Sequence, residues 1–347
     1  MGVKVDDKSF KFMFLDHPTN FELEQALDDF EQNLINRKIH VTAREGLSGK
    51  DELRFTEPFP KIESHDSYIY GVLATPTDID DGRSEFFNIQ FVMHERMSLV
   101  ILWGPENETK IRSKELFARI SHSPIAVTQL GDASSQEPGD IFVQVAQVIV
   151  QDLQMLVTRL HRSVHKETTQ IESQLFDDEY QSMSRSTSDT YGRIRRLKFE
   201  ILSIAPTINE TQNVFKAIYD RAVLIRPPFR IEDRETSPFS TDQRIWIDDL
   251  LMRTRSLKAQ RNGLEQEVRL LYERLESLES RRQTAAQMRF AAVASILLLP
   301  ALIVGFFGQN FEINPWASAE YAWEICAATL TFIAVSQFIY FKRKKWF

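Results

Sequence analysis

Few side chains in this sequence are arranged to carry out covalent chemistry. His161 and His165 have the spacing that lets two imidazoles share a metal on one helix face, but the HExxH form is absent because Arg162 follows His161. The sequence also lacks a P-loop, a GxSxG motif and a dinucleotide fingerprint. Its single cysteine, Cys326, excludes an intramolecular disulfide and a CxxC metal knuckle. We therefore expect neither catalysis nor ATP-driven pumping.

A second set of polar residues lies at the end of a long apolar run near the C-terminal end. The run covers residues 290–311 without a charged side chain and contains Gly308, Gln309 and Asn310 near its end. The acidic residues that follow are Glu312, Glu320 and Glu324. An ordinary anionic loop is one interpretation of these carboxylates. That they concentrate cations at the outer mouth of a pore is the interpretation that depends on the family resemblance described below.

The elements that must position these residues are two membrane-spanning helices. At about 1.5 Å per residue, a helix over residues 290–311 is about 33 Å long, enough for a hydrocarbon core of about 30 Å. A second apolar run covers residues 321–341, with Glu324 as its only charge beside Tyr321 and Trp323, residue types typical of the membrane interface. A buried helical hairpin of a large soluble domain is the alternative, but core helices rarely run this long without a charged face.

The charges that flank the two runs predict their orientation. Basic residues precede the first run and follow the second, whereas the connection between the runs has no Lys or Arg. The flanking basic residues are Arg281, Arg282 and Arg289, and Lys342, Arg343, Lys344 and Lys345. The excess of positive charge on the cytoplasmic side of membrane proteins therefore places both termini in the cytoplasm. The N-terminal residues show no apolar segment of a signal peptide.

The composition of the whole chain hides this segregation. Its 347 residues include 42 Lys and Arg against 49 Asp and Glu, which gives a formal net charge of −7. The acidic balance argues against a nucleic-acid binder, which needs positive charge to displace counterions. Read as averages, these values describe a soluble globular protein. We expect that description to hold only for the part before the first span.

The N-terminal third predicts a mixed α/β domain. Thr19 is a candidate N-cap for a helix over residues 20–36. Residues 85–94 and 98–103 are strand-like and separated by a short polar turn, which indicates an antiparallel hairpin. Further elements are expected over residues 10–15, 67–73 and, as a helix, 110–120.

The middle of the chain is predicted to be helical. Helices are expected over residues 140–176 and 191–224, joined by a polar loop or helix tip over 177–190, and prolines interrupt residues 226–241. A continuous helix then begins near Asp242. Its leucines at seven-residue spacing are Leu250, Leu257, Leu264, Leu271 and Leu278. Such heptads predict a packed stalk, and the pattern leaves open whether the stripe faces a pore or the neighbouring helical hairpin.

This arrangement resembles the CorA family of two-span divalent-cation channels and transporters, in which a Gly-x-Asn tripeptide ends the first span. The resemblance in organisation rests on the large cytosolic domain, the long helix entering the first span, the short acidic loop, the second span and the basic tail. At the level of residues it covers roughly 288–347. There, Pro300, Gly305 and the ending Gly308-Gln309-Asn310-Phe311-Glu312 are similar to the family's first-span signature.

The resemblance implies a homopentamer in the cell inner (plasma) membrane, with the first span lining a pore. Gly308, Gln309 and Asn310 would form the selectivity filter, where a ring of Asn310 carbonyls holds a Mg²⁺ or Zn²⁺ ion that keeps its water shell. The implied pore-lining and gate residues are Gln287, Phe290, Ala294, Leu298 and Ala301. The expected partners are divalent cations, the lipid bilayer and further copies of the chain, without nucleic acid or a permanently bound cofactor.

Two departures from the family's pattern leave the transported ion open. Magnesium-type members carry Met at the position of Gln309, and the zinc-transporting ZntB branch carries Ile. The family's Met-Pro-Glu-Leu becomes Asn314, Pro315, Trp316 and Ala317, which removes the usual loop glutamate. We favour a magnesium channel or transporter gated through the cytosolic domain. The alternatives are a zinc transporter of ZntB type, including one working outward, and a non-conducting membrane-anchored sensor or scaffold.

The expected fold class is therefore an α+β cytosolic domain with a long helical hairpin and a stalk helix, followed by two transmembrane α-helices, assembled as a CorA-like homopentameric funnel. The predicted parts are a cytosolic α/β domain (1–135), a helical hairpin and linker (136–240), a stalk helix (241–289), transmembrane helix 1 (290–309), an external loop (310–320), transmembrane helix 2 (321–341) and a basic cytosolic tail (342–347). The position of any regulatory metal site in the cytosolic part stays open.

Overall fold

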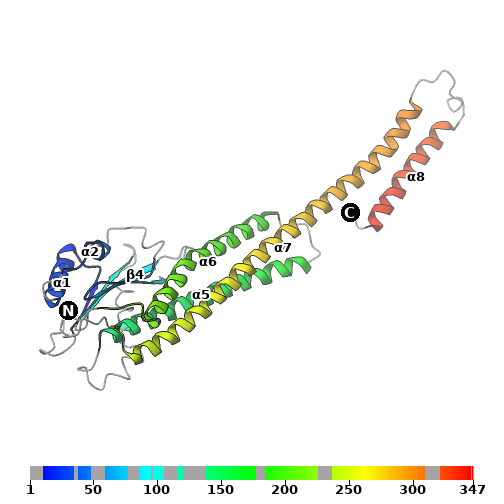
Figure 1. Cartoon of the computed structure of the whole chain (residues 1–347). Helices are drawn as coiled ribbons and strands as arrows, with labels where there is room; N and C mark the ends of the chain where they lie inside the picture. Colours follow the sequence, from blue (N-terminus) through cyan, green and yellow to red (C-terminus); the bar gives the residue numbers. More distant parts are fainter. Residues whose placement is uncertain are drawn as a thin grey trace. The chain divides into compact units, whose positions relative to one another are not determined.

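The structure, a computed structural model, confirms an architecture of one sheet, long helices and C-terminal apolar helices (Figure 1). The described residues are 11–34, 38–47, 59–76, 86–94, 97–104, 116, 118–119, 137–176, 184–225, 237–308, 321–344 and 346. Most of the helix expected over 110–120 falls outside them. The chain divides into two compact units, an N-terminal unit (Met1–Leu270) and a C-terminal unit (Leu271–Phe347).

The N-terminal unit is built on a five-stranded sheet in the order β1-β5-β4-β3-β2. The strands are β1 (Lys11–Asp16), β2 (Lys61–Ser64), β3 (Ile69–Pro76), β4 (Phe86–His94) and β5 (Met97–Trp103). The expected hairpin is confirmed, because β4 and β5 pair antiparallel. β1 pairs parallel to β5. This pairing joins strands far apart in the sequence, and no local sequence pattern predicted it.

Helices cover both faces of the sheet, so its central strands are buried throughout. α1 (Asn20–Asn33) and α2 (Val41–Leu47) form one core with side chains such as Val92 and Leu99. Neighbouring strand residues point the other way, and the Phe91 ring packs 5.1 Å from Phe142 of α5 (Pro138–Phe176). This alternation is the two-residue period of a strand buried on both faces.

Local capping begins α1 where the sequence predicted it. The Thr19 hydroxyl accepts a hydrogen bond from the backbone N–H of Glu22, and the Glu22 carboxylate accepts one from the backbone N–H of Thr19 at 2.8 Å. This reciprocal pair is a capping box, which satisfies donors that a helix start otherwise leaves without partners.

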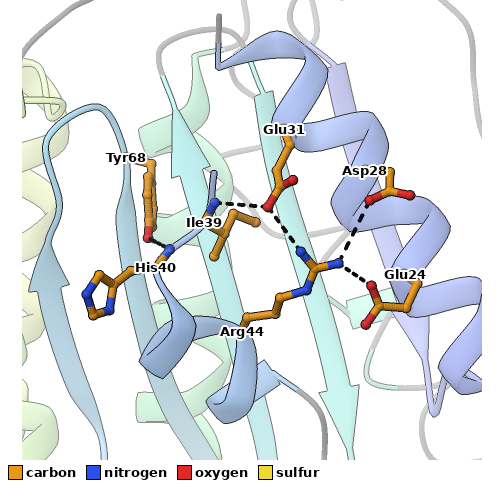
Figure 2. A network of polar contacts seen from close by, with 7 residues as sticks. All are labelled: Glu24, Asp28, Glu31, Ile39, His40, Arg44 and Tyr68. Carbon is orange, nitrogen blue, oxygen red and sulfur yellow. Dashed lines mark hydrogen bonds and ion pairs between the residues drawn. The ribbon is translucent and has the colours of Figure 1, made fainter. Parts of the chain in front are cut away.

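Arg44 ties α2 to α1 (Figure 2). Its guanidinium donates to the carboxylates of Glu24 and Glu31 and lies 3.8 Å from that of Asp28. The hydrogen bond to Glu24 is the main reason why the pKa of Arg44 is raised. Glu31 also accepts the backbone N–H of Ile39 at 3.0 Å, so one carboxylate stabilises both the helix pair and the segment 38–40 that precedes α2.

Tyr68 fixes the same segment from the sheet side. Its hydroxyl accepts the backbone N–H of His40 at 2.7 Å (Figure 2). Its ring stacks on that of His65, with ring centroids 4.6 Å apart. Burial lowers the pKa of His65, and the nearby Glu63 carboxylate offsets this in part. The neutral imidazole is therefore favoured in the folded protein.

α5 and α6 (Ser184–Tyr219) form the expected helical hairpin. α6 begins earlier than residue 191, so the stretch 177–190 is helical from Ser184 onward. Arg193 of α6 joins the two helices. It donates to Glu167 of α5 at 2.9 Å and, within α6, to Asp189 at 2.6 Å and the Thr190 hydroxyl at 3.1 Å.

α7 (Thr241–Phe307) starts at a second capping box, a helix cap that was not predicted from the sequence. The Ser240 N–H donates to Gln243 Oε1 at 2.9 Å, and the Gln243 N–H donates to the Ser240 hydroxyl at 3.3 Å. The Gln243 side-chain amide also donates to Asp140 Oδ1 at 2.9 Å and to Glu137 Oε2 at 3.1 Å. The cap of α7 is thereby bonded to the start of α5. The Ser-x-x-Gln spacing was the signal that could have revealed this cap.

The heptad leucines of α7 are buried within the single chain. Their exposed fractions are 2–3% for Leu250, Leu257, Leu264, Leu271 and Leu278. In the N-terminal unit the neighbouring helix is α6, because the Arg261 guanidinium reaches the carbonyl of Ile201 at 3.3 Å. The leucines of the N-terminal unit are thus covered by their own chain, as packing within the chain requires.

Candidate ion pathway

Three helices in the described part of the chain are long and apolar enough to cross a membrane. They are α5 (over Pro138–Ser173), α7 (over Thr241–Phe306) and α8 (Ala322–Arg343, over Trp323–Arg343). The three helices differ in how much of their apolar surface is buried. The most apolar window of α5 is 72% buried inside the protein, whereas those of α7 and α8 are 6% buried. The exposed apolar surface therefore belongs to the two C-terminal helices.

The end of α7 has two different faces. Five residues are less exposed than their neighbours: Ala292, Ser295, Ile296, Pro300 and Ile303. Their spacing of three and four residues places them on one face of the helix. In α8 a similar stripe is partly buried: Cys326, Leu330, Ile333, Ala334, Gln337 and Phe341. Both stripes lie in the compact C-terminal unit, and we take them as the faces through which α7 and α8 pack.

The predicted pore residues lie on the opposite face of α7. Gln287, Phe290, Ala294, Leu298 and Ala301 are all exposed in the single chain, with Phe290 at 76% and Leu298 at 72%. At about 100° per residue, this set is centred about half a turn from the stripe of less exposed residues. The structure thus brings the set together on one exposed face, opposite the less exposed stripe.

Gly308 follows the last turn of α7. Its backbone N–H donates to the carbonyl of Val304 at 2.8 Å, and a Cβ at this position would lie 3.1 Å from that same carbonyl oxygen. The close approach explains why a residue without a side chain suits this turn. Pro300 lies inside α7, and the helix continues through it to Phe307.

Several predicted site residues fall outside the described part of the chain: Gln309, Asn310, Glu312 and Glu320. Glu324 is described. It is exposed and lies in the first turn of α8, where a carboxylate interacts favourably with the positive end of the helix dipole. Lys342 and Arg343 occupy the last turn of the same helix, where the dipole favours cations.

Within the described residues, no cluster of three or more His, Cys, Asp or Glu side chains is arranged to hold a metal ion. Asp249, one of the acidic residues that could have served a regulatory site, is paired with Arg253 at 2.8 Å. An inter-subunit metal site would need a second copy of the chain.

Comparison with known proteins settles the family. Residues 23–343 match the family described as CorA-like Mg²⁺ transporter protein. The chain belongs to this family. CorA proteins are transporters and channels rather than enzymes, in agreement with the absence of catalytic motifs.

Individual CorA-family relatives are distant. The chain is 26% identical over 171 residues to the cobalt/magnesium transport protein CorA of Thermotoga maritima, which covers 48% of this chain and 44% of the relative. The sequence alignment therefore spans less than half of that relative's length.

Solved structures share the fold across more of the chain. The complete structure of the CorA magnesium transporter from Methanocaldococcus jannaschii superposes with a TM-score of 0.72 at 14% identity, over 99% of this chain and 94% of that one. The cytoplasmic domain of ZntB from Vibrio parahaemolyticus superposes with a TM-score of 0.53 at 9% identity, over 79% of this chain and 90% of that domain.

Proposed function

We propose that this chain is a divalent-cation channel or transporter of the cell inner membrane, with magnesium as the favoured ion. Family membership over residues 23–343 and relatives named as magnesium transporters support the ion class. The observation that carries the pathway is the two-faced end of α7. One face is partly buried, and the opposite face presents an unbroken row from Gln287 to Ala301.

A pathway requires several copies of the chain. Two helices cannot enclose water, and a bare ion cannot cross hydrocarbon, so the exposed row on α7 must meet its equivalents around an axis. We propose a homopentamer in which Leu298 and Phe290 form apolar constrictions that gate by dewetting. Asn310 forms the ring at the outer mouth, beside Gly308 and Gln309. Glu312, Glu320 and Glu324 attract cations to that mouth.

Gating is proposed to run along α7. The helix is uninterrupted from Thr241 to Phe307, and it is capped at its start by contacts to α5. A change in the N-terminal unit can thereby bias the end of the helix. Both termini are proposed to lie in the cytoplasm, with the loop between α7 and α8 outside.

A zinc transporter of ZntB type is the second candidate. The superposition with the ZntB cytoplasmic domain supports keeping it, and Gln309, which is neither the Met of magnesium-type members nor the Ile of the ZntB branch, leaves the ion open. Uptake of Mg²⁺ and of Zn²⁺ into proteoliposomes loaded with ion-sensitive dyes separates the two. We expect Mg²⁺ flux that Gln309→Met increases, whereas Zn²⁺ flux without Mg²⁺ flux would replace the first proposal by the second.

The Asn310 ring has its own test. Asn310→Ala is expected to lower flux at least tenfold, whereas Asn314→Ala, in the same loop, is the matched control and should leave flux unchanged. Absence of flux for both ions, with no effect of Asn310→Ala, would leave only a sensor or scaffold. Native mass measurement in detergent tests the pentamer, and a monomer or dimer would contradict it.

A further inference from the structure

The N-terminal unit contains a cleft that the proposed ion pathway does not use. Its volume is about 740 Å³, in the range of small-molecule sites. β3, β4 and α5 line it, together with Leu116 and Arg119.

Among the described residues that line the cleft, positive side chains outnumber negative ones. Three guanidinium groups, of Arg119, Arg159 and Arg162, are present with one carboxylate, that of Asp152. Glu200 of α6 lies 3.9 Å from Arg159 and forms an ion pair with it, which compensates part of the charge of Arg159. Arg159 and Arg162 are three residues apart on α5, so their side chains are neighbours and repel each other. An anion bound between them would remove that repulsion.

The buried carboxylate orients one of the three arginines. Asp152 is 8% exposed, and it accepts a hydrogen bond from the Thr75 hydroxyl at 2.7 Å. Its other oxygen lies 2.6 Å from Arg119 Nη2. With both carboxylate oxygens engaged, Asp152 fixes the position of a guanidinium at the cleft. Guanidinium groups held in this way match the geometry of phosphate oxygens.

The remaining lining has the character of a site for an organic group. Gln151, Gln154 and Thr158 add neutral hydrogen-bonding groups on the same helix. Met155, which is 54% exposed, supplies apolar surface, and the buried Phe87 and Leu156 lie at the edge of the cleft. A ligand with a phosphate group and a flat apolar part would use both kinds of surface, whereas a metal cation would meet three guanidinium groups and one carboxylate.

We propose that this cleft binds the phosphate group of a small phosphorylated metabolite. The arginines contact the phosphate, and the apolar side chains contact the organic part. The site belongs to the N-terminal unit. Ligand binding at this site is measured without ion transport, so the result tests this proposal independently of the proposed function. Free inorganic phosphate and a nucleotide are the two sources of the same chemistry, and the apolar surface favours the nucleotide.

Isothermal titration of the full-length protein in detergent tests this site, with ATP, AMP and inorganic phosphate as probes in a magnesium-free buffer containing EDTA. We expect ATP to bind and the double variant Arg159→Gln/Arg162→Gln to weaken it by about tenfold or more. Lys166→Gln is the matched control, because Lys166 lies on the same helix outside the cleft lining. Thermal unfolding of each variant verifies that it remains folded.

The outcomes decide both the site and the source. Tighter binding of ATP than of inorganic phosphate assigns a nucleotide, and equal binding of the two assigns free phosphate and supports the site. Equal loss of binding in Lys166→Gln and in the double variant would overturn the proposal, as would the absence of binding for all three probes. Binding should also weaken as salt rises, because the contacts are ionic.

Discussion

α5 and the end of α7 have similar apolar character and opposite surroundings. Both contain a window long and apolar enough to cross a membrane, yet that of α5 is 72% buried inside the protein and that of α7 is 6% buried. The N-terminal unit supplies α5 with a sheet and a partner helix. The end of α7 has α8 beside it in its unit and otherwise needs lipid or further copies of the chain. An apolar window alone therefore does not identify a membrane-spanning helix. Whether other parts of the protein cover that window decides.

The same contrast occurs within α7 itself. Leu257 is 2% exposed and Leu298 is 72% exposed, although both lie in one helix and have the same side chain. The first stabilises the chain by packing, whereas the second is exposed in the single chain. The following variants test this difference, from the largest expected effect to the smallest.

Leu257→Ala should lower the free energy of unfolding by about 2 to 5 kcal/mol, because it leaves a cavity in a packed interface. Leu298→Ala should change it by no more than about 0.5 kcal/mol and should instead raise ion flux by widening an apolar constriction. Chemical denaturation followed by circular dichroism measures the first quantity, and proteoliposome uptake the second. Equal losses of stability for the two variants would mean that the ends of α7 are packed alike.

Arg193→Ala should cost about 2 to 3 kcal/mol, because Glu167, whose side chain is 9% exposed, loses its guanidinium partner. Arg253→Ala is the matched control. Its pair with Asp249 is about half exposed on both sides, and such pairs contribute no more than about 1 kcal/mol. Denaturation of the two variants side by side measures the difference, and a larger loss for Arg253→Ala would contradict the role assigned to the buried pair.

Thr19→Ala should cost about 1 kcal/mol, because it removes the cap of α1. Thr329→Ala in α8 removes a hydroxyl that donates only to the carbonyl of Ile325 in the preceding turn, at 2.8 Å, and should cost almost nothing. Thermal unfolding compares them. A loss in Thr329→Ala as large as that in Thr19→Ala would mean that α8 depends on its own polar contacts.

Glu200→Gln tests the smallest effect, a pH dependence confined to the N-terminal unit. Burial raises the pKa of Glu200, and Arg159 offsets this only in part. A carboxyl with a raised pKa binds more protons in the folded than in the unfolded chain, so its contribution to stability falls as pH rises from its unfolded value through the raised one. The melting temperature of Glu200→Gln should therefore exceed that of the wild type at neutral pH and match it in acid. Equal melting temperatures of the two proteins at every pH would contradict this role of Glu200.

Sequence patterns predicted the parts of the fold that depend on neighbours along the chain. The Thr19 cap, the hairpin of β4 and β5 and the leucines of α7 follow from short-range spacing, and all three were found. The parallel pairing of β1 with β5 was not predicted, because it joins strands far apart in the sequence. Short elements such as β2 and α2 were missed as well, since contacts with the sheet rather than local propensity stabilise them.

The candidate ion pathway likewise combines local features, which spacing along the sequence predicts, with tertiary features, which it does not predict. Helical periodicity grouped Phe290, Ala294 and Leu298 on one face, and the structure places that face opposite the partly buried one. Helical periodicity left open which element the leucine stripe packs against. A row of apolar residues indicates that a helix has a packing partner, but it does not identify that partner. The arginines of the cleft were not singled out either, since Arg119 and Arg159 come together only through the tertiary fold.

The double use of Gln243 has a mechanical consequence. Its side chain closes the cap of α7 and, at the same time, bonds to Asp140 and Glu137 at the start of α5. The first turn of α7 therefore resists rotation about the helix axis, because rotation would break the cap and the bonds to α5 together. A twisting force applied at the other end of α7 is then taken up as twist or bend along the helix. The stiffness of the helix between Gln243 and Pro300 determines how much of that force is transmitted.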